Sequence, residues 1–211
     1  MKKILTTLVI VIGFYNLSFA QQRFGEQEAG NTEFGLDVGY NSAYLLESQS
    51  AHSSDFVSGF NVGISSDYYF SKAWSLKVKV IYDQKGWGNG YITTNGDILY
   101  SDVNFKLNYV TVPVMANWHF GRTRNWYLNF GPYIGFLTSA KETTDNIDVK
   151  DSFNSVDGGI ALGVGIKIPI SDNAKFFIEY DGQGGVVNVF KQADGTYQNI
   201  RGSFNIGINF Q

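Results

Sequence analysis

Two-residue alternation of apolar and polar side chains recurs eight times between Glu33 and Phe210, and this pattern constrains the fold more than any other feature. A period of two places successive side chains on opposite faces of a β-strand. No window holds 18 consecutive apolar residues, and no helical stripe persists. The alternation therefore predicts eight strands, at residues 33–41, 58–70, 74–84, 107–120, 126–138, 156–168, 175–183 and 199–210.

The connections between these strands also alternate in length. The links after the second, fourth and sixth strands are short turns, whereas those after the first, third, fifth and seventh are long: 42–57, 85–106, 139–155 and 184–198. Short turns at one end and long loops at the other are typical of outer-membrane barrels. The fold class that we predict is all-β, an eight-stranded antiparallel up-and-down transmembrane β-barrel.

One face of each predicted strand is apolar, and the other is more polar and carries the charged residues. This difference indicates which face points into the lumen. A soluble lipocalin-like barrel has an apolar interior, but here one face carries many charges. An Arg or Lys at the bilayer midplane costs about 2–4 kcal/mol, so we expect these charges to point inward. Glu179 and Arg201, on adjacent strands, are predicted to join Lys77 or Lys79 in a lumen charge network. Eight strands leave room only for side chains, so an open pore is not expected.

Aromatic residues gather where the apolar faces end. Transmembrane barrels carry aromatic girdles at both membrane interfaces. The residues predicted to form the girdle at the short-turn end are Phe70, Trp74, Phe120, Trp126 and Phe210.

The N-terminus has the features of an export signal. Lys2 and Lys3 precede an apolar run at residues 4–15, and Ser18-Phe19-Ala20 offers small residues for cleavage. We predict a signal peptide at 1–20 cleaved after Ala20, a periplasmic lead-in at 21–32 and the barrel domain at 33–211. Loss of the two lysines leaves 14 basic and 19 acidic residues, a net charge of −5, which argues against nucleic-acid binding.

Motifs for catalysis or metal binding are weak. His52 stands beside Ser53, Ser54 and Asp55 on the first long loop, where a lipid-modifying enzyme would place such a set. A Ser-His-Asp site is defined by geometry that sequence neighbours seldom achieve. Four acidic residues on the third long loop do not match EF-hand spacing: Glu142, Asp145, Asp148 and Asp151. The prediction is therefore no catalytic site, no metal and no cofactor.

The second long loop contains a hairpin signal. Asn95-Gly96 favours a type I′ turn, and apolar and aromatic residues flank it on both sides. We expect the third and fourth strands to continue as a ribbon above the membrane. An exposed strand edge of this kind offers a site for strand addition by a partner.

Three segments resemble the PorT-like outer-membrane β-barrel domain family. They are residues 60–86, 107–120 and 127–141, and the most specific pieces are Tyr82-Asp83-Gln84-Lys85-Gly86, Leu107-Asn108-Tyr109 with Pro113, and Gly131-Pro132-Tyr133. The resemblance implies an eight-stranded barrel of the OmpA/OmpX size class in a Gram-negative outer membrane. It also implies a secretion-accessory role, because the family's namesake is tied to a secretion pathway.

These observations predict a non-enzymatic integral outer-membrane protein with a filled polar lumen and a structural, adhesive or secretion-accessory role. The expected partners are outer-membrane lipid and lipopolysaccharide, the barrel-assembly machinery, and an extracellular or secretion partner that contacts the loops. Two alternatives stay open at this point: a loop-based lipid-modifying enzyme and a narrow channel.

Overall fold

The computed structural model describes residues 28–47, 52–94, 97–192 and 195–211 of the chain. The expected signal peptide, most of the lead-in and the Asn95-Gly96 turn lie outside the described residues. Within those ranges no helix is long and apolar enough to cross a membrane. The described elements are β1 (Thr32–Glu47), β2 (His52–Ser53), β3 (Val57–Tyr69), β4 (Trp74–Thr94), β5 (Asp97–Phe120), β6 (Trp126–Glu142), the 3-10 turn η1 (Lys150–Ser152), β7 (Val156–Ser171), β8 (Ala174–Gly185) and β9 (Tyr197–Phe210).

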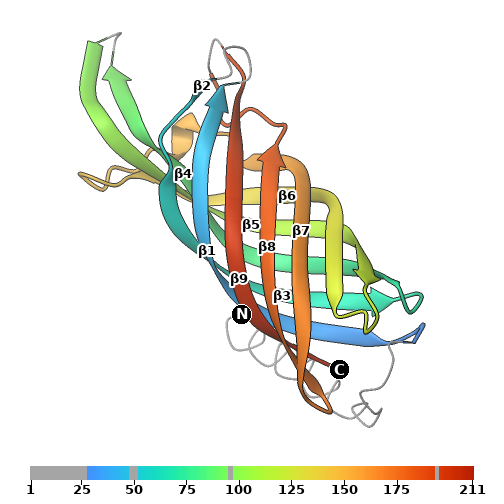
Figure 1. Ribbon diagram of the computed structural model, residues 1–211. Helices are drawn as coiled ribbons and strands as arrows, with labels where there is room; N and C mark the ends of the chain where they lie inside the picture. The colour runs from blue at the N-terminus through green and yellow to red at the C-terminus, as the bar shows by residue number, and fades with distance from the viewer. Residues whose placement is uncertain (1–27, 48–51, 95–96, 193–194) are drawn as a thin grey trace, which may run out of the picture.

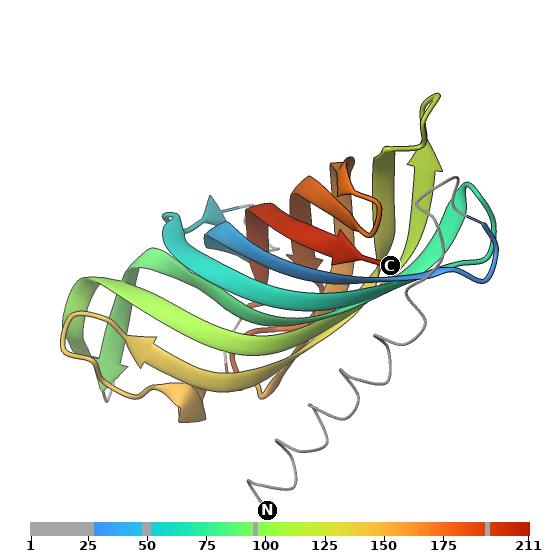
Figure 2. The same cartoon turned by 90° about the horizontal axis from the view of Figure 1, so that it is seen from below.

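The long strands form a closed ring (Figures 1 and 2). Each pairs antiparallel with its neighbours in chain order, from β1 through β3 to β9, and β1 pairs with β9 from Phe34 opposite Phe210 to Glu47 opposite Tyr197. The two-residue strand β2 only flanks the upper end of β1. The predicted eight-stranded up-and-down barrel is therefore confirmed.

Several strands are longer than the alternation predicted. β4 runs on to Thr94 and β5 starts at Asp97, so within the 85–106 connection both strands continue as the ribbon that the Asn95-Gly96 signal predicted. β1 begins at Thr32, inside the expected lead-in, and β7 runs to Ser171, so the turn before β8 is shorter than expected. Apolar and polar side chains must alternate only where a strand has lipid on one side and the polar lumen on the other. Backbone pairing continues beyond that region, so the alternation underestimates the strand lengths.

Burial follows the pleat of the strands. In β4 the side chains of Lys77 and Lys79 are buried, whereas Leu76, Val80 and Tyr82 are 40–43% exposed. The same outward apolar face surrounds the ring and is far larger than the apolar patches of soluble monomers. This wall suits contact with lipid, and the charged face lines the lumen.

Candidate functional site

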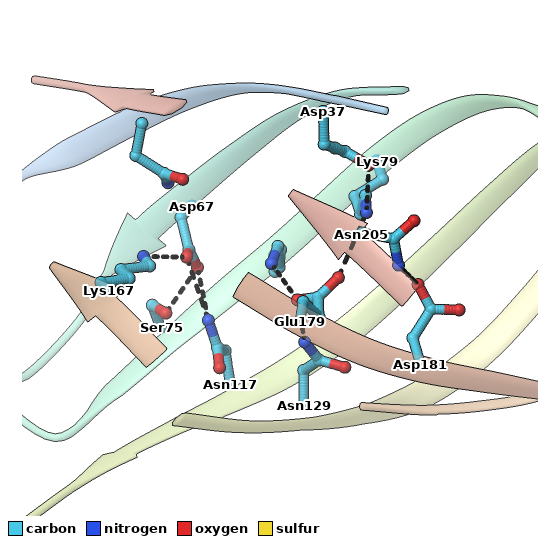
Figure 3. Close-up of polar contacts among 12 residues, drawn as sticks. Asp37, Asp67, Ser75, Lys79, Asn117, Asn129, Lys167, Glu179, Asp181 and Asn205 are labelled. Carbon is cyan, nitrogen blue, oxygen red and sulfur yellow. Dashed lines mark hydrogen bonds and ion pairs between the residues drawn. The ribbon is translucent and has the colours of Figure 1, made fainter. Parts of the chain in front are cut away.

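The lower lumen, at the short-turn end, holds a cluster of ion pairs around Lys167 (Figure 3). The Lys167 Nζ atom lies 2.5 Å from a Glu33 carboxylate oxygen and 2.9 Å from one of Asp67. Lys175 pairs with the other oxygen of Glu33 at 2.5 Å. Ser75 also donates to Asp67 at 2.6 Å. The cluster joins β1, β3, β4, β7 and β8 across the interior.

Three of the residues expected in a charge network meet at Glu179 on β8. Its carboxylate accepts from Lys77 at 2.8 Å, Lys79 at 3.3 Å and Asn129 at 2.9 Å. Lys79 also reaches Asp37 on β1 at 3.1 Å, as Figure 3 shows. Strands from opposite sides of the ring are thereby tied through one carboxylate.

Arg201, the fourth expected member, pairs at a higher level of the lumen. Its guanidinium donates to Asp181 and, at 3.2 Å, to Asp83. The β8–β9 register sets Glu179 opposite Asn205 and places Arg201 four residues farther up β9. No ion pair of the described residues joins Arg201 to Glu179 directly.

Basic side chains in the lumen are paired with carboxylates at every level. Higher still, Lys85 pairs with Asp157 at 2.8 Å and its Nζ atom lies 4.5 Å from the centre of the Tyr133 ring. Each basic side chain buried in the described lumen faces a carboxylate: Lys77, Lys79, Lys85, Lys167, Lys175 and Arg201. Loss of one partner of a buried pair is strongly destabilising, so these pairs fix the relative positions of the strands.

An apolar cap closes the extracellular end of the lumen above these charges. The Trp87 and Phe105 rings stack 5.0 Å apart, and Phe153 packs edge-on against Trp87 at 5.7 Å. We define the apolar cap by its buried members: Leu45, Trp87, Val103, Phe105, Leu107, Tyr109, Leu137, Ala140, Phe153 and Val189. The sequence analysis does not predict this cluster, because its members come from separate parts of the chain that only the closed ring brings together. Leu107 and Leu137, apolar side chains on the inward face, were the available signal.

Two extracellular connections are fastened over the cap. Phe153, after η1, bridges to Phe190 in the β8–β9 connection. Asn154 donates its side-chain amide to the carbonyl oxygens of Asn188 and Phe190 at 2.8 and 3.0 Å. The Lys191 backbone N–H donates to Ser152 at 3.1 Å. Both connections therefore act as a fixed cover of the lumen.

Strands β4 and β5 continue past this cover as a two-stranded ribbon (green, upper left in Figure 1). Their pairing extends to Thr94 opposite Asp97. We define the ribbon as residues 89–94 and 97–103. In the described part of the chain, neither of its outer edges pairs with another strand beyond Gly88 on β4 or Asn104 on β5.

The Tyr82–Gly86 segment fixes where the ribbon leaves the barrel. Asn41 donates to Asp83 at 2.9 Å and to the Gln84 carbonyl at 2.8 Å. At Gly86, φ is +145° and a Cβ atom would overlap the Phe105 carbonyl oxygen. Only glycine fits this close approach of β4 to β5.

The expected girdle residues lie at the short-turn end. Trp74 begins β4, Trp126 begins β6 and Phe210 ends β9, while Phe120 ends β5 and Phe70 follows β3. The rings of Trp74 and Trp118 stack 6.2 Å apart. The outward side chains of Phe70, Trp126 and Phe210 are 44–54% exposed, as a lipid-facing position requires.

The first long loop carries the residues that a loop-based enzyme would use, and the structure shows how their backbone is placed. β2 places His52 opposite Glu47 and Ser53 opposite Leu46 on the ladder. The Ser54 hydroxyl accepts from the Leu45 backbone N–H at 2.8 Å, so it is used in a backbone contact. Among the described residues no group of three or more His, Cys, Asp or Glu side chains could hold a metal ion.

The Glu142 carboxylate binds backbone N–H groups. It accepts the N–H groups of Thr144 at 2.5 Å and Asp145 at 2.8 Å. Desolvation acts to raise the pKa of Glu142, but these donors outweigh it and hold the pKa below its ordinary value. The carboxylate therefore stabilises the start of the β6–β7 connection.

Comparison with known proteins places the chain in a family of outer-membrane barrels. A family model described as an outer membrane protein beta-barrel domain matches residues 19–191. The outer membrane protein OprG from Pseudomonas aeruginosa is 11% identical over 88% of this chain and 98% of its own, with a TM-score of 0.50. Ail, the attachment invasion locus protein of Yersinia pestis, is 15% identical over 85% of this chain and 99% of its own, with a TM-score of 0.45. Neisserial surface protein A is 18% identical over 84% and 96%, with a TM-score of 0.46. No curated protein matches the chain.

Proposed function

Because the chain belongs to the outer membrane protein beta-barrel domain family, we propose that this outer-membrane barrel is a non-enzymatic, adhesive protein whose ribbon binds extracellular partners by strand addition. The observation that carries the proposal is the pair of ribbon edges beyond Gly88 and Asn104, which pair with no other strand among the described residues. Exposed edges in soluble proteins are usually protected by Lys or Pro. Residues 89–103 contain neither.

The chemistry of the ribbon favours one kind of partner. Residues 89–103 include Asp97 and Asp102 and no basic residue. An extended segment that carries Lys or Arg would complete the backbone hydrogen bonds and complement this charge. The partner class that fits is therefore an extended, basic peptide segment of an extracellular protein.

The rest of the barrel acts as a scaffold for the ribbon. Paired charges fill the lumen, and the apolar cap and its fixed cover lie above them. This filling favours a binding role over the channel alternative, because eight strands leave no space beyond that taken by side chains.

A ribbon-deleted barrel tests the adhesive role. We would replace residues 91–102 by an Asn-Gly turn, which keeps the Gly90–Val103 pair and the cap residue Val103, and select a random peptide display library on nanodisc-embedded barrels. Wild type is expected to enrich extended basic peptides, and the deletion is expected to lose them. The control variant Asp145→Ala/Asp148→Ala, on another extracellular connection, is expected to bind as wild type does. Equal enrichment by the deletion would overturn the proposal.

The non-enzymatic part of the proposal has its own test. Replacement of His52 by Ala is expected to leave the lipid and lipopolysaccharide profiles of the cells unchanged, because Ser54 is engaged by backbone. A changed profile that the wild-type gene restores would instead support the loop-based enzyme.

Three finer expectations are part of the same proposal. A signal peptide cleaved after Ala20 would deliver the chain, and N-terminal sequencing of the mature protein tests it. The Tyr82–Gly86, Leu107–Tyr109 and Gly131–Tyr133 motifs support placement among PorT-like barrels. That placement carries a secretion-accessory role as the second candidate function, for which gene deletion should reduce the amount of secreted protein. Lipopolysaccharide and the barrel-assembly machinery complete the proposed partners.

A further inference from the structure

A groove of about 470 Å³ runs along the outer wall of the barrel, where β7, β8, β9 and β1 lie side by side. Its rims include the exposed side chains of Leu162 and Tyr180, and Gly182, Gly184 and Gly202 lie between them. The register pairs Gly182 with both Leu162 and Gly202. The lipid-facing wall is therefore hollowed at one place by the absence of outward side chains.

Barrel geometry does not require glycine at two positions of this groove, Gly182 and Gly184. On the inward face, a Cβ at Gly39 would overlap the Asn205 side chain, and one at Gly131 would overlap the Val114 carbonyl. A Cβ at Gly184 would meet nothing within 4 Å, and one at Gly182 would meet only the Arg201 carbonyl oxygen at 3.8 Å. Glycine within a strand is unfavourable because it adds no side-chain contact. At these two positions the sequence keeps a groove open that ordinary side chains would fill.

The groove lies in the outer half of the membrane. Gly202 is eight residues from Phe210, the predicted girdle residue that ends β9. On a tilted strand, this separation corresponds to a distance of about 20 Å along the membrane normal. The apolar band of such barrels is about 25 Å tall. The upper end is marked by Tyr44, whose ring packs edge-on against Phe56 at 4.8 Å. An aromatic residue that carries a hydroxyl is typical of the membrane interface.

The groove runs along the strands from the level of Tyr180 to that of Tyr44. Tyr180 pairs with Phe204 and thus with Tyr40, and Tyr44 is four residues farther up β1. This spacing is about 13 Å. The groove is continuous with the lipid-facing wall on every strand that borders it, so lipid is the molecule next to it. The convex wall of a second barrel would touch only the rims, whereas a flexible methylene chain can enter.

We propose that this groove is a specific binding site for one hydrocarbon chain of an outer-leaflet lipid. Leu162, Ile160 and Ile200 supply apolar walls, and the ring of Tyr180, whose hydroxyl lies over Gly202, forms the lower rim. The chain lies along the groove, with its ester or amide end toward Tyr44. Dispersion contacts in a groove exceed those on a flat wall, because the chain is touched on three sides. The site is independent of the ribbon.

Native mass spectrometry of the full barrel in detergent tests the proposal, with dimyristoyl phosphatidylethanolamine as the probe. Wild type is expected to retain one lipid at collision energies that remove all others. In Gly182→Leu/Gly184→Leu the retained fraction should fall by about tenfold or more, because each Leu displaces several packed methylene groups. Ala116→Leu adds a Leu to the outward face of β5 and should retain lipid as wild type does. Glycerophosphoethanolamine, which lacks chains, should give no adduct.

Three results would overturn the inference: equal retention by the double Leu variant, equal loss in Ala116→Leu, or binding of the chainless headgroup. A wild-type dimer without lipid that the double variant abolishes would assign the groove to a second copy of the chain instead. Heat-modifiable migration on gels checks that each variant has folded. Gly184→Leu alone replaces the double variant if the latter does not fold, since its Cβ has open space.

Discussion

Removal of the Glu179 carboxylate should destabilise the barrel more than any single change on its outer wall. In Glu179→Ala, Lys77 loses its ion-pair partner at 2.8 Å, whereas Lys79 keeps Asp37 at 3.1 Å. Asn129 loses an acceptor at 2.9 Å. An uncompensated buried charge costs about 3–5 kcal/mol, and the lost amide hydrogen bond about 1 kcal/mol more. We expect the free energy of unfolding to fall by about 4–6 kcal/mol.

Equilibrium unfolding in guanidinium of barrels folded into lipid vesicles measures this loss through fluorescence of the four Trp residues. The matched variant Glu179→Gln/Lys77→Met removes both charges at once and should lose only about 1–2 kcal/mol, because no charge is left unpaired. The double variant should therefore lose less stability than the sum of the losses of Glu179→Gln and Lys77→Met measured alone. The reasoning fails if Glu179→Ala unfolds at the wild-type denaturant concentration or if the double variant is the less stable of the two.

Three further predictions concern the girdle, the β6–β7 connection and the lumen. Trp74→Ala should lower the free energy of unfolding by about 1 kcal/mol, because the Trp118 ring loses its stacked partner; an unchanged denaturation midpoint would contradict this. The lowered pKa of Glu142 means that its stabilisation is complete above its ordinary value of 4.5 and is lost as pH falls through the lower folded value. The hydrogen-exchange protection factors of the Thr144 and Asp145 amides should therefore stay high at pH 5 and fall only in stronger acid; low protection at pH 5 would refute it. Planar-bilayer recordings should show no sustained conductance, since the lumen is filled, and steady open-pore currents would restore the channel alternative.

The membrane-embedded part of the fold could be predicted because two solvents act on it. Lipid requires apolar side chains at Leu76 and Val80, and the lumen accepts Lys77 and Lys79 between them. A slip of one residue would turn every lipid-facing side chain of the strand into the lumen. The alternation therefore also determines which side chains face the lipid and which face the lumen. The Asn95-Gly96 signal predicted the ribbon for a comparable local reason.

What escaped prediction depends on the ring as a whole. The height in the lumen at which Arg201 meets Asp83 and Asp181 depends on the register of every strand pair between β4 and β9. No local sequence pattern determines how these registers add up around the ring. The apolar cap likewise unites Leu45, Trp87 and Phe153 from distant parts of the chain. Above the membrane, lipid no longer enforces an apolar outer face, so alternation stops marking where strands end.

The pairing of β1 with β9 means that the ring closes only when the last strand of the chain is in place. Thr32–Glu47 finds its second partner only in Tyr197–Phe210, the last strand of the chain. Until then, a row of backbone N–H and C=O groups on β1 would face hydrocarbon, where each unsatisfied group costs several kcal/mol. A chain that stops before Tyr197 is therefore not a smaller barrel but a molecule that the bilayer rejects. The β1–β9 seam therefore makes stable membrane insertion depend on the presence of the complete last strand.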